Sequence, residues 1–420
     1  MESYAKFHPR ASKTGLIMLS PRDIHNIDDL TEFKVRVHSL KVGETERQNC
    51  DLRISYDEKA RILLHLGEHC ENTFSIFGID ASIKYSSASA ELPIFISRQR
   101  LSTTAESPIV EARANKEPMT LCETGGASRF EAIIINPPQF ISNEICLIDH
   151  YGNCFKIHPR EFDDGSTCFL EGFIEISNEN WLEKIQKLSI FLTFLKGSHC
   201  GIGHLFAYAE NSDLCFRALG FSRSDRDPRQ TNWFDIEVQN ALPEIFSKFS
   251  KATSDETTLR ALRQTIDFYR ASNASRDVSL EMAIIAAHSA LESIVHYILG
   301  FRAGWSSTLL DNKSAKFSDK SRAAAFFFGV SSDLLSYSPY LKQLSSTRNN
   351  IDAFEIISLF RNKLVHQDKK FIPTGPQLFE VWLVTQWLIE VLVFKIIGFE
   401  GEIIDRRRYG DWRGTTCKIP

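Results

Sequence analysis

Short apolar and alternating runs dominate the first part of the chain, and they predict β-strands there. Gly, Asp and Asn bound the first three of these runs, and Tyr151-Gly152-Asn153 is typical of a hairpin turn. Antiparallel strands with one solvated face favour a β-sandwich or an open barrel. The predicted strands are residues 33–38, 61–66, 74–79, 109–114, 129–135, 145–149, 154–158 and 169–176.

The apolar spacing changes to three and four residues after Asn180, which predicts an amphipathic helix over 179–196 that ends at Gly197. Two strand-like runs follow, at 203–210 and 214–223, and the polar segment 222–230 indicates a loop. We expect the first domain to end near residue 240.

Helical periodicity alone continues beyond this point. The strongest pattern covers 280–298, with Gly300 as the expected C-cap. Short connections favour an antiparallel bundle, so the predicted fold class is α+β, with a β-rich domain at 1–240 and an all-α domain at 241–420. The other predicted helices are 259–269, an Ala-Phe-rich segment ending at 328, 340–344, 350–366 and 376–397.

The composition is that of an ordinary globular protein, with 420 residues, 43% hydrophobic and 24% charged. The N-terminus lacks the apolar segment of a signal peptide, and Glu390 interrupts the longest apolar run. Nine cysteines without regular spacing indicate free thiols in a reducing compartment. We therefore expect a soluble cytoplasmic protein without a membrane span.

The formal charge of -4 is unevenly distributed. Residues 245–420 carry a net charge of +5, which leaves -9 for residues 1–244. The helical half is therefore the one expected to meet a polyanion, although its excess is small compared with dedicated nucleic-acid binders.

Three different polar groups cluster at the end of the predicted helix 350–366, namely Arg361, Asn362 and His366. At about 100° per residue, Asn362 and His366 share a helix face, whereas Arg361 and His366 diverge by roughly 140°. Three arrangements would let Arg361 and His366 act together. Either the long arginine stem bends around the helix, or the last turn unwinds, or the two groups meet across an interface with a second copy of the chain.

Arg361-Asn362-(three residues)-His366 resembles the Arg-polar-x3-His signature of the HEPN superfamily, helical domains found in many RNA-cleaving toxins and antiphage nucleases. Upstream, Ala290-Leu291-Glu292 resembles the "ALE" helix of the Apea-like branch, whose acidic residue sits close to the Arg/His site. The similarity covers roughly residues 250–400. It implies a metal-independent endoribonuclease of antiphage or abortive-infection type that acts on RNA, with tRNA as one candidate, and that needs no cofactor.

The chemistry of these groups suits that activity. His366 would move a proton, Arg361 would stabilise charge on the scissile phosphate, and Asn362 would fix the orientation of the imidazole or the phosphate. The 2′-hydroxyl of RNA is the nucleophile, so a 2′,3′-cyclic phosphate would result. HEPN enzymes typically pair two motifs across a dimer, which predicts a homodimer through the helical domain.

Other residues are expected to support the site. Glu292, four residues after His288, either orients Arg361 or is a solvent-exposed carboxylate. Lys363 and the run Arg406-Arg407-Arg408 are candidates for substrate binding, because arginines beside stackable aromatics are typical of RNA contacts; the alternative is a surface segment packed on the β-rich domain.

Two further predictions concern metal binding and the role of the first domain. Cys146, His150, Cys154 and His158 have ligand-type side chains, but their spacing matches no familiar zinc scheme, so we expect no metal site. The acidic first domain would sense a trigger, such as a phage product. The alternative is a non-catalytic HEPN module that only dimerises or binds RNA as a scaffold.

Overall fold

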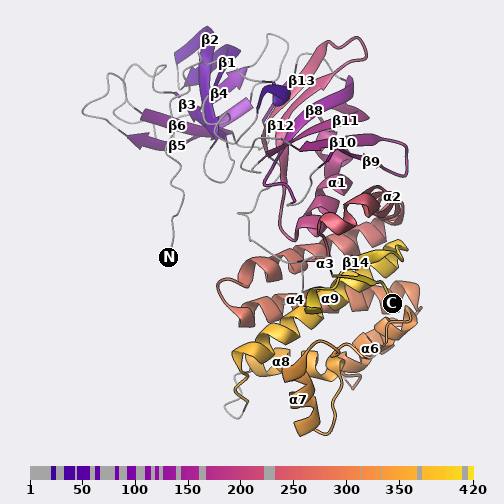
Figure 1. The fold of residues 1–420 in the computed structure, drawn as a ribbon. Coiled ribbons are helices and arrows are strands. Elements are labelled where there is room, and N and C mark those ends of the chain that lie inside the picture. The colour runs from indigo at the N-terminus through magenta and orange to yellow at the C-terminus, as the bar shows by residue number, and fades with distance from the viewer. Residues whose placement is uncertain are drawn as a thin grey trace.

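The computed structural model describes residues 20–24, 33–42, 45–56, 62–66, 81–84, 92–100, 109–114, 119–122, 126–138, 143–159, 167–221, 232–312, 314–331, 333–366, 371–408 and 415–420. Strands fill the first half and helices the second, so the predicted α+β layout in two parts is confirmed. Figure 1 shows the strands at one end of the molecule and the helices at the other.

The β-rich half holds two sheets rather than one sandwich or one open barrel. Six antiparallel strands close a barrel in the order β1-β2-β3-β6-β5-β4. The expected strands at 33–38, 61–66 and 109–114 belong to it, whereas the one expected at 74–79 lies outside the described residues. The barrel strands are β1 (Phe33–Val42), β2 (Thr45–Tyr56), β3 (Ile62–His65), β4 (Ala81–Lys84), β5 (Leu92–Arg100) and β6 (Ile109–Ala114).

The second sheet has seven strands in the order β7-β13-β12-β8-β11-β10-β9. The turn at residues 151–153 joins β9 to β10, as predicted, and Gly152 adopts φ 87° there. The strands are β7 (Met119–Cys122), β8 (Gly126–Ile135), β9 (Ile145–Ile148), β10 (Cys154–Pro159), β11 (Thr167–Ser177), β12 (Gly201–Tyr208) and β13 (Leu214–Phe221).

The central strand β8 shows why this sheet has two different faces. Alternate residues point to opposite sides, so Phe130 and Ile134 enter the large core with α1 (Trp181–Lys196), while Ile133 and Ile135 meet Ile24 on the other side. Helix α1 ends at Gly197 in the left-handed conformation, at φ 77°, as predicted.

The helical half begins with a 3₁₀ turn, η4 (Ile236–Ala241), and wraps around α9 (Gly375–Ile397), which is buried along nearly its whole length. Such an all-round apolar helix is a core helix. The other helices are α2 (Leu242–Ala252), α3 (Glu256–Ser275), α4 (Leu280–Tyr297), α5 (Ser307–Leu310), α6 (Phe317–Phe327), α7 (Pro339–Thr347) and α8 (Ala353–Val365), and a short hairpin of β14 (Glu402–Ile404) and β15 (Thr416–Lys418) follows α9.

The end of α4 differs from the prediction. Gly300 does not cap the helix, because a π-helical turn, η5 (Ile298–Arg302), continues it past the glycine. The backbone N–H of Ala303 donates to the carbonyl of Ile298 at 2.8 Å, which is an i to i+5 bond. In the described part of the chain, the helical stretch 280–302 is the one long and apolar enough to cross a membrane, but 61% of its window is buried, as in a core helix.

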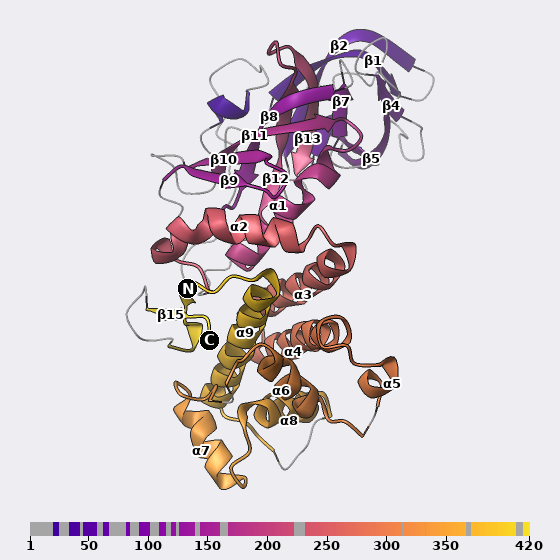
Figure 2. The same cartoon turned by 90° about the vertical axis from the view of Figure 1, so that its right-hand side faces the viewer.

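The two halves share a core across residue 240. The rings of Phe194 and Trp233 lie 5.1 Å apart, and Trp233 lies 4.9 Å from Phe394 of α9. Figure 2 shows α2 lying between the seven-stranded sheet and helices α3 and α9. The sheet with α1 and the bundle therefore form one packed body.

Candidate active site

Helix α8 carries the Arg-Asn-His motif and is fixed firmly at its start. Asp352 and Glu355 form a capping box, in which each side chain accepts a hydrogen bond from the other residue's backbone N–H, at 2.9 and 3.1 Å. Arg322 of α6 donates to the same Asp352 carboxylate at 2.7 Å, and Phe360 is buried. The C-terminal end of α8, in contrast, carries exposed residues.

The motif residues occupy this outward end. Arg361 is half-buried, whereas Asn362 and His366 are exposed. His366 is the C-cap, and its backbone N–H donates to the carbonyl of Asn362 at 3.1 Å. Because the helix stays regular to Val365, Arg361 and His366 leave it in different directions.

Asn362 lies between the two ionisable groups. Nη1 of Arg361 donates to Oδ1 of Asn362 at 3.2 Å, and Asn362 shares its helix face with His366. The long arginine side chain thus turns toward the carboxamide, which is one of the arrangements that the sequence left open. The structure thus brings Arg361 and Asn362 into contact, whereas the side chain of His366 is related to them only by its position on the helix.

The side chain of α4 on which the charge of Arg361 acts is His288, which the sequence analysis did not select for a role. Its imidazole is 5% exposed and lies 4.3 Å from the ring of Phe317, centroid to centroid. Burial, and secondly the positive charge of Arg361, lower the pKa of His288 to about 4. His288 is therefore neutral at pH 7 and does not offset the arginine's charge. Its place in the buried 284/288/291/295 seam of α4 is the signal that could have identified it.

Glu292 does not take the position expected of a partner for Arg361. It is exposed, in line with exposed Glu281 and His296, while Leu291 and Val295 beside it are buried. One residue turns a helix by about 100°, so the glutamate leaves the seam that holds His288. Within the described residues, no carboxylate pairs with Arg361, and Glu292 is a surface carboxylate.

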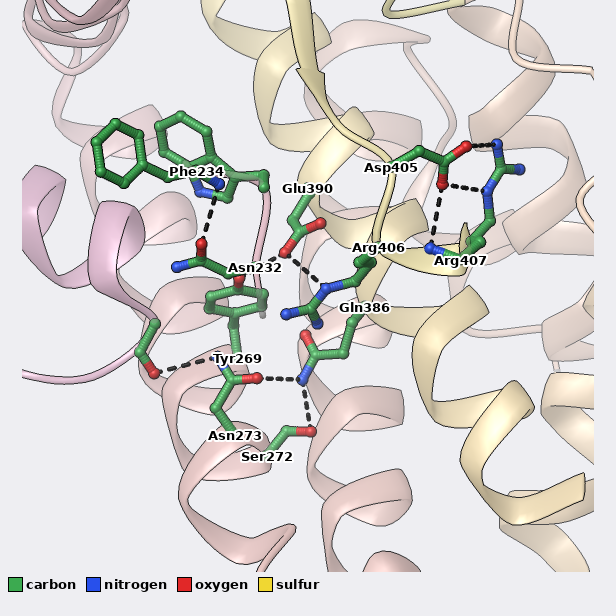
Figure 3. A network of polar contacts seen from close by, with 12 residues as sticks. Asn232, Phe234, Tyr269, Ser272, Asn273, Gln386, Glu390, Asp405, Arg406 and Arg407 are labelled. Atoms are coloured by element: carbon green, nitrogen blue, oxygen red, sulfur yellow. Dashed lines mark hydrogen bonds and ion pairs between the residues drawn. The ribbon is translucent and has the colours of Figure 1, made fainter. Parts of the chain in front are cut away.

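The arginines after α9 also differ from the expectation. Arg406 has a fully buried side chain and pairs with the equally buried Glu390 of α9 at 3.3 Å (Figure 3). Tyr269 donates to the same Glu390 oxygen at 2.5 Å. The prediction that Arg406 contacts RNA is therefore wrong, because a guanidinium enclosed between α3 and α9 cannot reach a ligand.

Arg407 and Arg408 are likewise engaged in packing. Arg407 chelates the buried Asp405 at 2.7 and 2.9 Å, as Figure 3 shows, and stacks 3.5 Å above the ring of Trp387. Arg408 is half-buried, 5.1 Å from the ring of Tyr337. Sequence alone could not distinguish these contacts from an RNA-binding surface, since both use arginine beside aromatics. Lys363 is half-buried in the last turn of α8.

The buried Glu390–Arg406 pair contains a carboxyl group with a strongly raised pKa. Burial raises the pKa of Glu390 to about 7, against the opposing influence of Arg406 and the Tyr269 hydroxyl. Gln386 continues the network toward Ser272 at 2.6 Å and Asn273 at 3.3 Å. This cluster holds the C-terminal segment on the bundle.

The sulfur and imidazole groups of β9 and β10 do not converge on one point. The sulfurs of Cys146 and Cys154 lie 3.1 Å apart, but His150 stacks on Tyr151 and Nδ1 of His158 faces Glu144 at 3.2 Å. Across the parts of the chain that the structure describes, no three His, Cys, Asp or Glu side chains gather as a metal site would require. Free thiols are found at Cys50, Cys146, Cys154, Cys168, Cys200, Cys215 and Cys417.

Comparisons with known proteins add similarity but no activity. Residues 255–418, from α3 to β15, match the YopA C-terminal domain family. The SPbeta prophage-derived uncharacterized protein YopA of Bacillus subtilis (strain 168) is 23% identical over 265 residues, which cover 62% of this chain and 55% of that protein. The chain thus spans about half the length of this curated relative. No solved structure matches the chain.

Proposed function

We propose that this chain is a metal-independent endoribonuclease whose active site lies at the end of α8. The observation that carries the proposal is Arg361, a half-buried guanidinium that bonds to Asn362 and, among the described residues, has no carboxylate partner. Such a group attracts an anion, because its charge is only partly solvated. The resemblance of the motif to the HEPN signature supports an RNA phosphate as this anion.

The three motif residues divide the chemistry of transesterification among them. The ribose 2′-oxygen attacks phosphorus and gives up its proton, and the bond from phosphorus to the 5′-oxygen breaks as that oxygen takes a proton. His366, exposed at the C-cap, moves one of these protons, while Arg361 stabilises the charge on the nonbridging oxygens. Asn362 keeps the two groups in register. The products are a 2′,3′-cyclic phosphate and a 5′-hydroxyl.

The divergence of Arg361 and His366 around α8 supports a site composed from two copies of the chain. One imidazole per copy supplies acid or base, and a second copy supplies the other. Apolar side chains flank the motif on the surface, with Val365 44% and Ile372 85% exposed. Exposed apolar residues in this place fit a homodimer contact through the helical domain.

The β-rich half is assigned to regulation. It contacts the bundle through α2 and through Phe194 and Trp233, which meet α9, so a ligand on the sheet can influence the helices without contacting α8. The likeness to a prophage-derived protein and the antiphage character of Apea-like HEPN domains support a cytoplasmic defence role with a phage-derived trigger. RNA, with tRNA among the candidates, is the proposed substrate.

The exposed Val365 and Ile372 also favour a second candidate function. A bundle that only dimerises would display the same apolar side chains and needs no catalytic histidine. This non-catalytic module would bind RNA or hold the β-rich half in a dimer as a scaffold.

Purified full-length protein incubated with total RNA or tRNA in EDTA separates the two functions. We expect cleavage whose 3′ ends accept an adaptor only after the cyclic phosphate is removed. His366→Ala and Arg361→Ala each abolish this cleavage, and an excess of His366→Ala added to the wild type lowers its cleavage, because a mixed dimer lacks one of the two imidazoles.

Matched surface variants serve as controls in the same assay. His296→Ala and Arg263→Ala alter exposed side chains on α4 and α3 and should retain full cleavage. Cleavage that survives in His366→Ala, or RNA left intact by the wild type with phage lysate present, overturns the nuclease and leaves the scaffold.

A further inference from the structure

A second candidate binding site lies in a cavity of about 620 Å³ where the ends of several helices meet. The C-terminal half of α2, the start of α3, the π-helical turn after α4 and the end of α9 line it. Helix α8 does not contribute to the lining. The cavity is in the size range of small-molecule sites, which suggests that it holds a ligand of its own.

One wall of the cavity is aromatic. The rings of Tyr297 and Phe301 stack with centroids 5.7 Å apart and an angle of 20° between their planes. Tyr297 is buried, and its hydroxyl is fixed by Thr258 at 2.6 Å and by Nε of Arg302 at 3.2 Å. Phe301, in contrast, is 64% exposed. The pair is a rigid platform with an open outer face, on which a flat aromatic group can stack.

The local backbone explains why Phe301 stands here. The π-helical turn adds a residue to the last turn of α4, so Phe301 and Arg302 are displaced from the positions that an α-helix would give them. Wide turns of this kind are frequent at functional sites. The π-helical turn therefore determines the position of the exposed Phe301.

The remaining walls carry an excess of positive charge. Lys248, Lys251 and Arg302 line the cavity, against Asp255 as the single carboxylate of the lining. Asp255 caps α3, accepting from the backbone N–H and the hydroxyl of Thr258 at 2.8 and 2.6 Å. These bonds lower the pKa of Asp255, so it is ionised at neutral pH, and a net charge of about +2 remains.

The cations differ in how free they are to reach a ligand. Lys248 donates to the carbonyl of Gly398 at 2.7 Å and lies 3.2 Å from Glu244, so its ammonium is held in place. Lys251 and Arg302 are exposed at the rim, and although Nε of Arg302 donates to the Tyr297 hydroxyl, its two terminal nitrogens remain for a ligand. A phosphate in the cavity would be bound by these two side chains, with Lys248 adding long-range attraction.

We propose that this cavity binds a nucleoside phosphate. The base stacks on Phe301, and the phosphate lies between Lys251 and Arg302. The ligand is either a free mononucleotide or one nucleotide of an RNA chain, since both offer the same base and phosphate. Tyr297 is nine residues beyond His288, about 14 Å along the axis of α4, so the cavity is separate from the end of α8.

The position of α2 gives binding a structural consequence. The hydroxyl of Ser250 on α2 accepts from the backbone N–H of His150, in the turn between β9 and β10, at 3.2 Å. A ligand held by Lys251 thus touches the helix that joins the sheet to the bundle. Occupancy stabilises that junction, and the thermal unfolding midpoint of the full-length chain should rise with ligand concentration.

Isothermal titration calorimetry on the full-length protein tests the proposal directly. The ligands are AMP, ATP, a short 5′-phosphorylated oligodeoxyribonucleotide, which lacks the cleavable 2′-hydroxyl, and inorganic phosphate. We expect Phe301→Ala to weaken nucleotide binding about fivefold or more, because one base-stacking contact is lost. Lys251→Gln and Arg302→Gln should each weaken it and reduce its dependence on salt. Tight binding of AMP identifies a free nucleotide as the ligand, whereas binding of the oligonucleotide alone identifies a nucleic acid.

Phe326→Ala is the matched control, because Phe326 is 51% exposed on α6 and does not line the cavity. It should bind every ligand as the wild type does. Three results overturn the proposal: no binding of AMP, ATP or the oligonucleotide by the wild type at millimolar concentration, inorganic phosphate binding as tightly as AMP and the oligonucleotide, or Phe301→Ala and Arg302→Gln binding unchanged.

Discussion

His288 and Arg361 interact electrostatically, and the buried imidazole of His288 is uncharged at neutral pH. A neutral imidazole beside the guanidinium leaves its positive charge intact, whereas a carboxylate in the same place would cancel it. Burial is the first cause of the lowered pKa of His288. Without Arg361 this pKa would therefore be higher, but still below its ordinary value. The pair therefore favours an anion from outside the chain.

The pair predicts a loss of stability in acid. The pKa of His288 is about 4 in the folded chain, below the ordinary value of 6.5, so the unfolded state binds the proton more tightly. The contribution of His288 is complete above pH 6.5 and is lost as the pH falls toward 4. Arg361→Gln should raise the pKa of His288, as titration of the imidazole signals by NMR would show, so the loss of stability still begins near pH 6.5 but is smaller in total.

Arg263→Gln provides the matched control, because it removes the same charge from an exposed side chain on α3. It should leave the titration midpoint of His288 unchanged. If Arg361→Gln also leaves this midpoint unchanged, Arg361 does not act on His288 and the proposed electrostatic interaction is wrong.

Helices and strands with strong local signals could be predicted from the sequence. Helices α1 and α9 and strands β8 to β11 follow from apolar spacing and turn residues, and the end of α1 follows from Gly197. The positions of Asn362 and His366 on one face of α8 follow from helix geometry in the same way. These features depend on residues close together in the chain.

Features set by distant packing could not be predicted in this way. Strand β2 begins with a polar run, Thr45-Glu46-Arg47-Gln48, and is a strand because it pairs with β1. Gly300 looked like a cap, but the π-helical turn depends on hydrogen bonds further along. The burial of Arg406 likewise depends on Glu390 and Tyr269, whose proximity only the tertiary fold creates.

The attachment of the C-terminal segment to α9 leads to a second prediction. Removing one member of a buried ion pair leaves the other charge uncompensated, at a cost of about 3–5 kcal/mol. Glu390→Gln should lower the free energy of unfolding by about this amount. Arg406→Met should lower it less, because Glu390, whose pKa is already about 7, then takes up a proton and becomes neutral. The double variant should lose less than the sum, because no uncompensated charge remains. Urea denaturation of the four proteins measures the coupling.

Asp319→Asn provides the comparison for an exposed pair. Asp319 faces Arg322 at 2.8 Å with its side chain 56% exposed, so the change should cost less than about 1 kcal/mol. Additive losses in the double variant would mean that Glu390 and Arg406 stabilise the bundle independently.

The whole molecule does not separate at residue 240, although the composition changes there. Asn273 of α3 donates to the carbonyl of Gly197 at 3.1 Å, and Trp233 donates from Nε1 to the carbonyl of Phe194 at 3.0 Å. The backbone N–H of Ile404 in turn donates to the carbonyl of Trp233 at 2.9 Å. Residues before 240 thus complete the bundle, whereas the barrel contacts the seven-stranded sheet through Tyr56 of β2, whose hydroxyl accepts from the backbone N–H of Gly220 at 3.2 Å.

This arrangement predicts which fragments fold. A fragment of residues 241–420 lacks Phe194 and Trp233, which contact Phe394 of α9, so it exposes a large apolar surface. We expect it to lose near-ultraviolet circular dichroism and cooperative thermal unfolding. A fragment of residues 115–420 keeps the seven-stranded sheet and α1, and should unfold cooperatively like the full chain. Cooperative unfolding of 241–420 at the midpoint of the longer fragment would show instead that the bundle is an independent domain. A trigger bound by the β-rich half would then act through the contacts of α2 alone. If the prediction holds, the same trigger can change the packing of α9 directly, because sheet and bundle share one core.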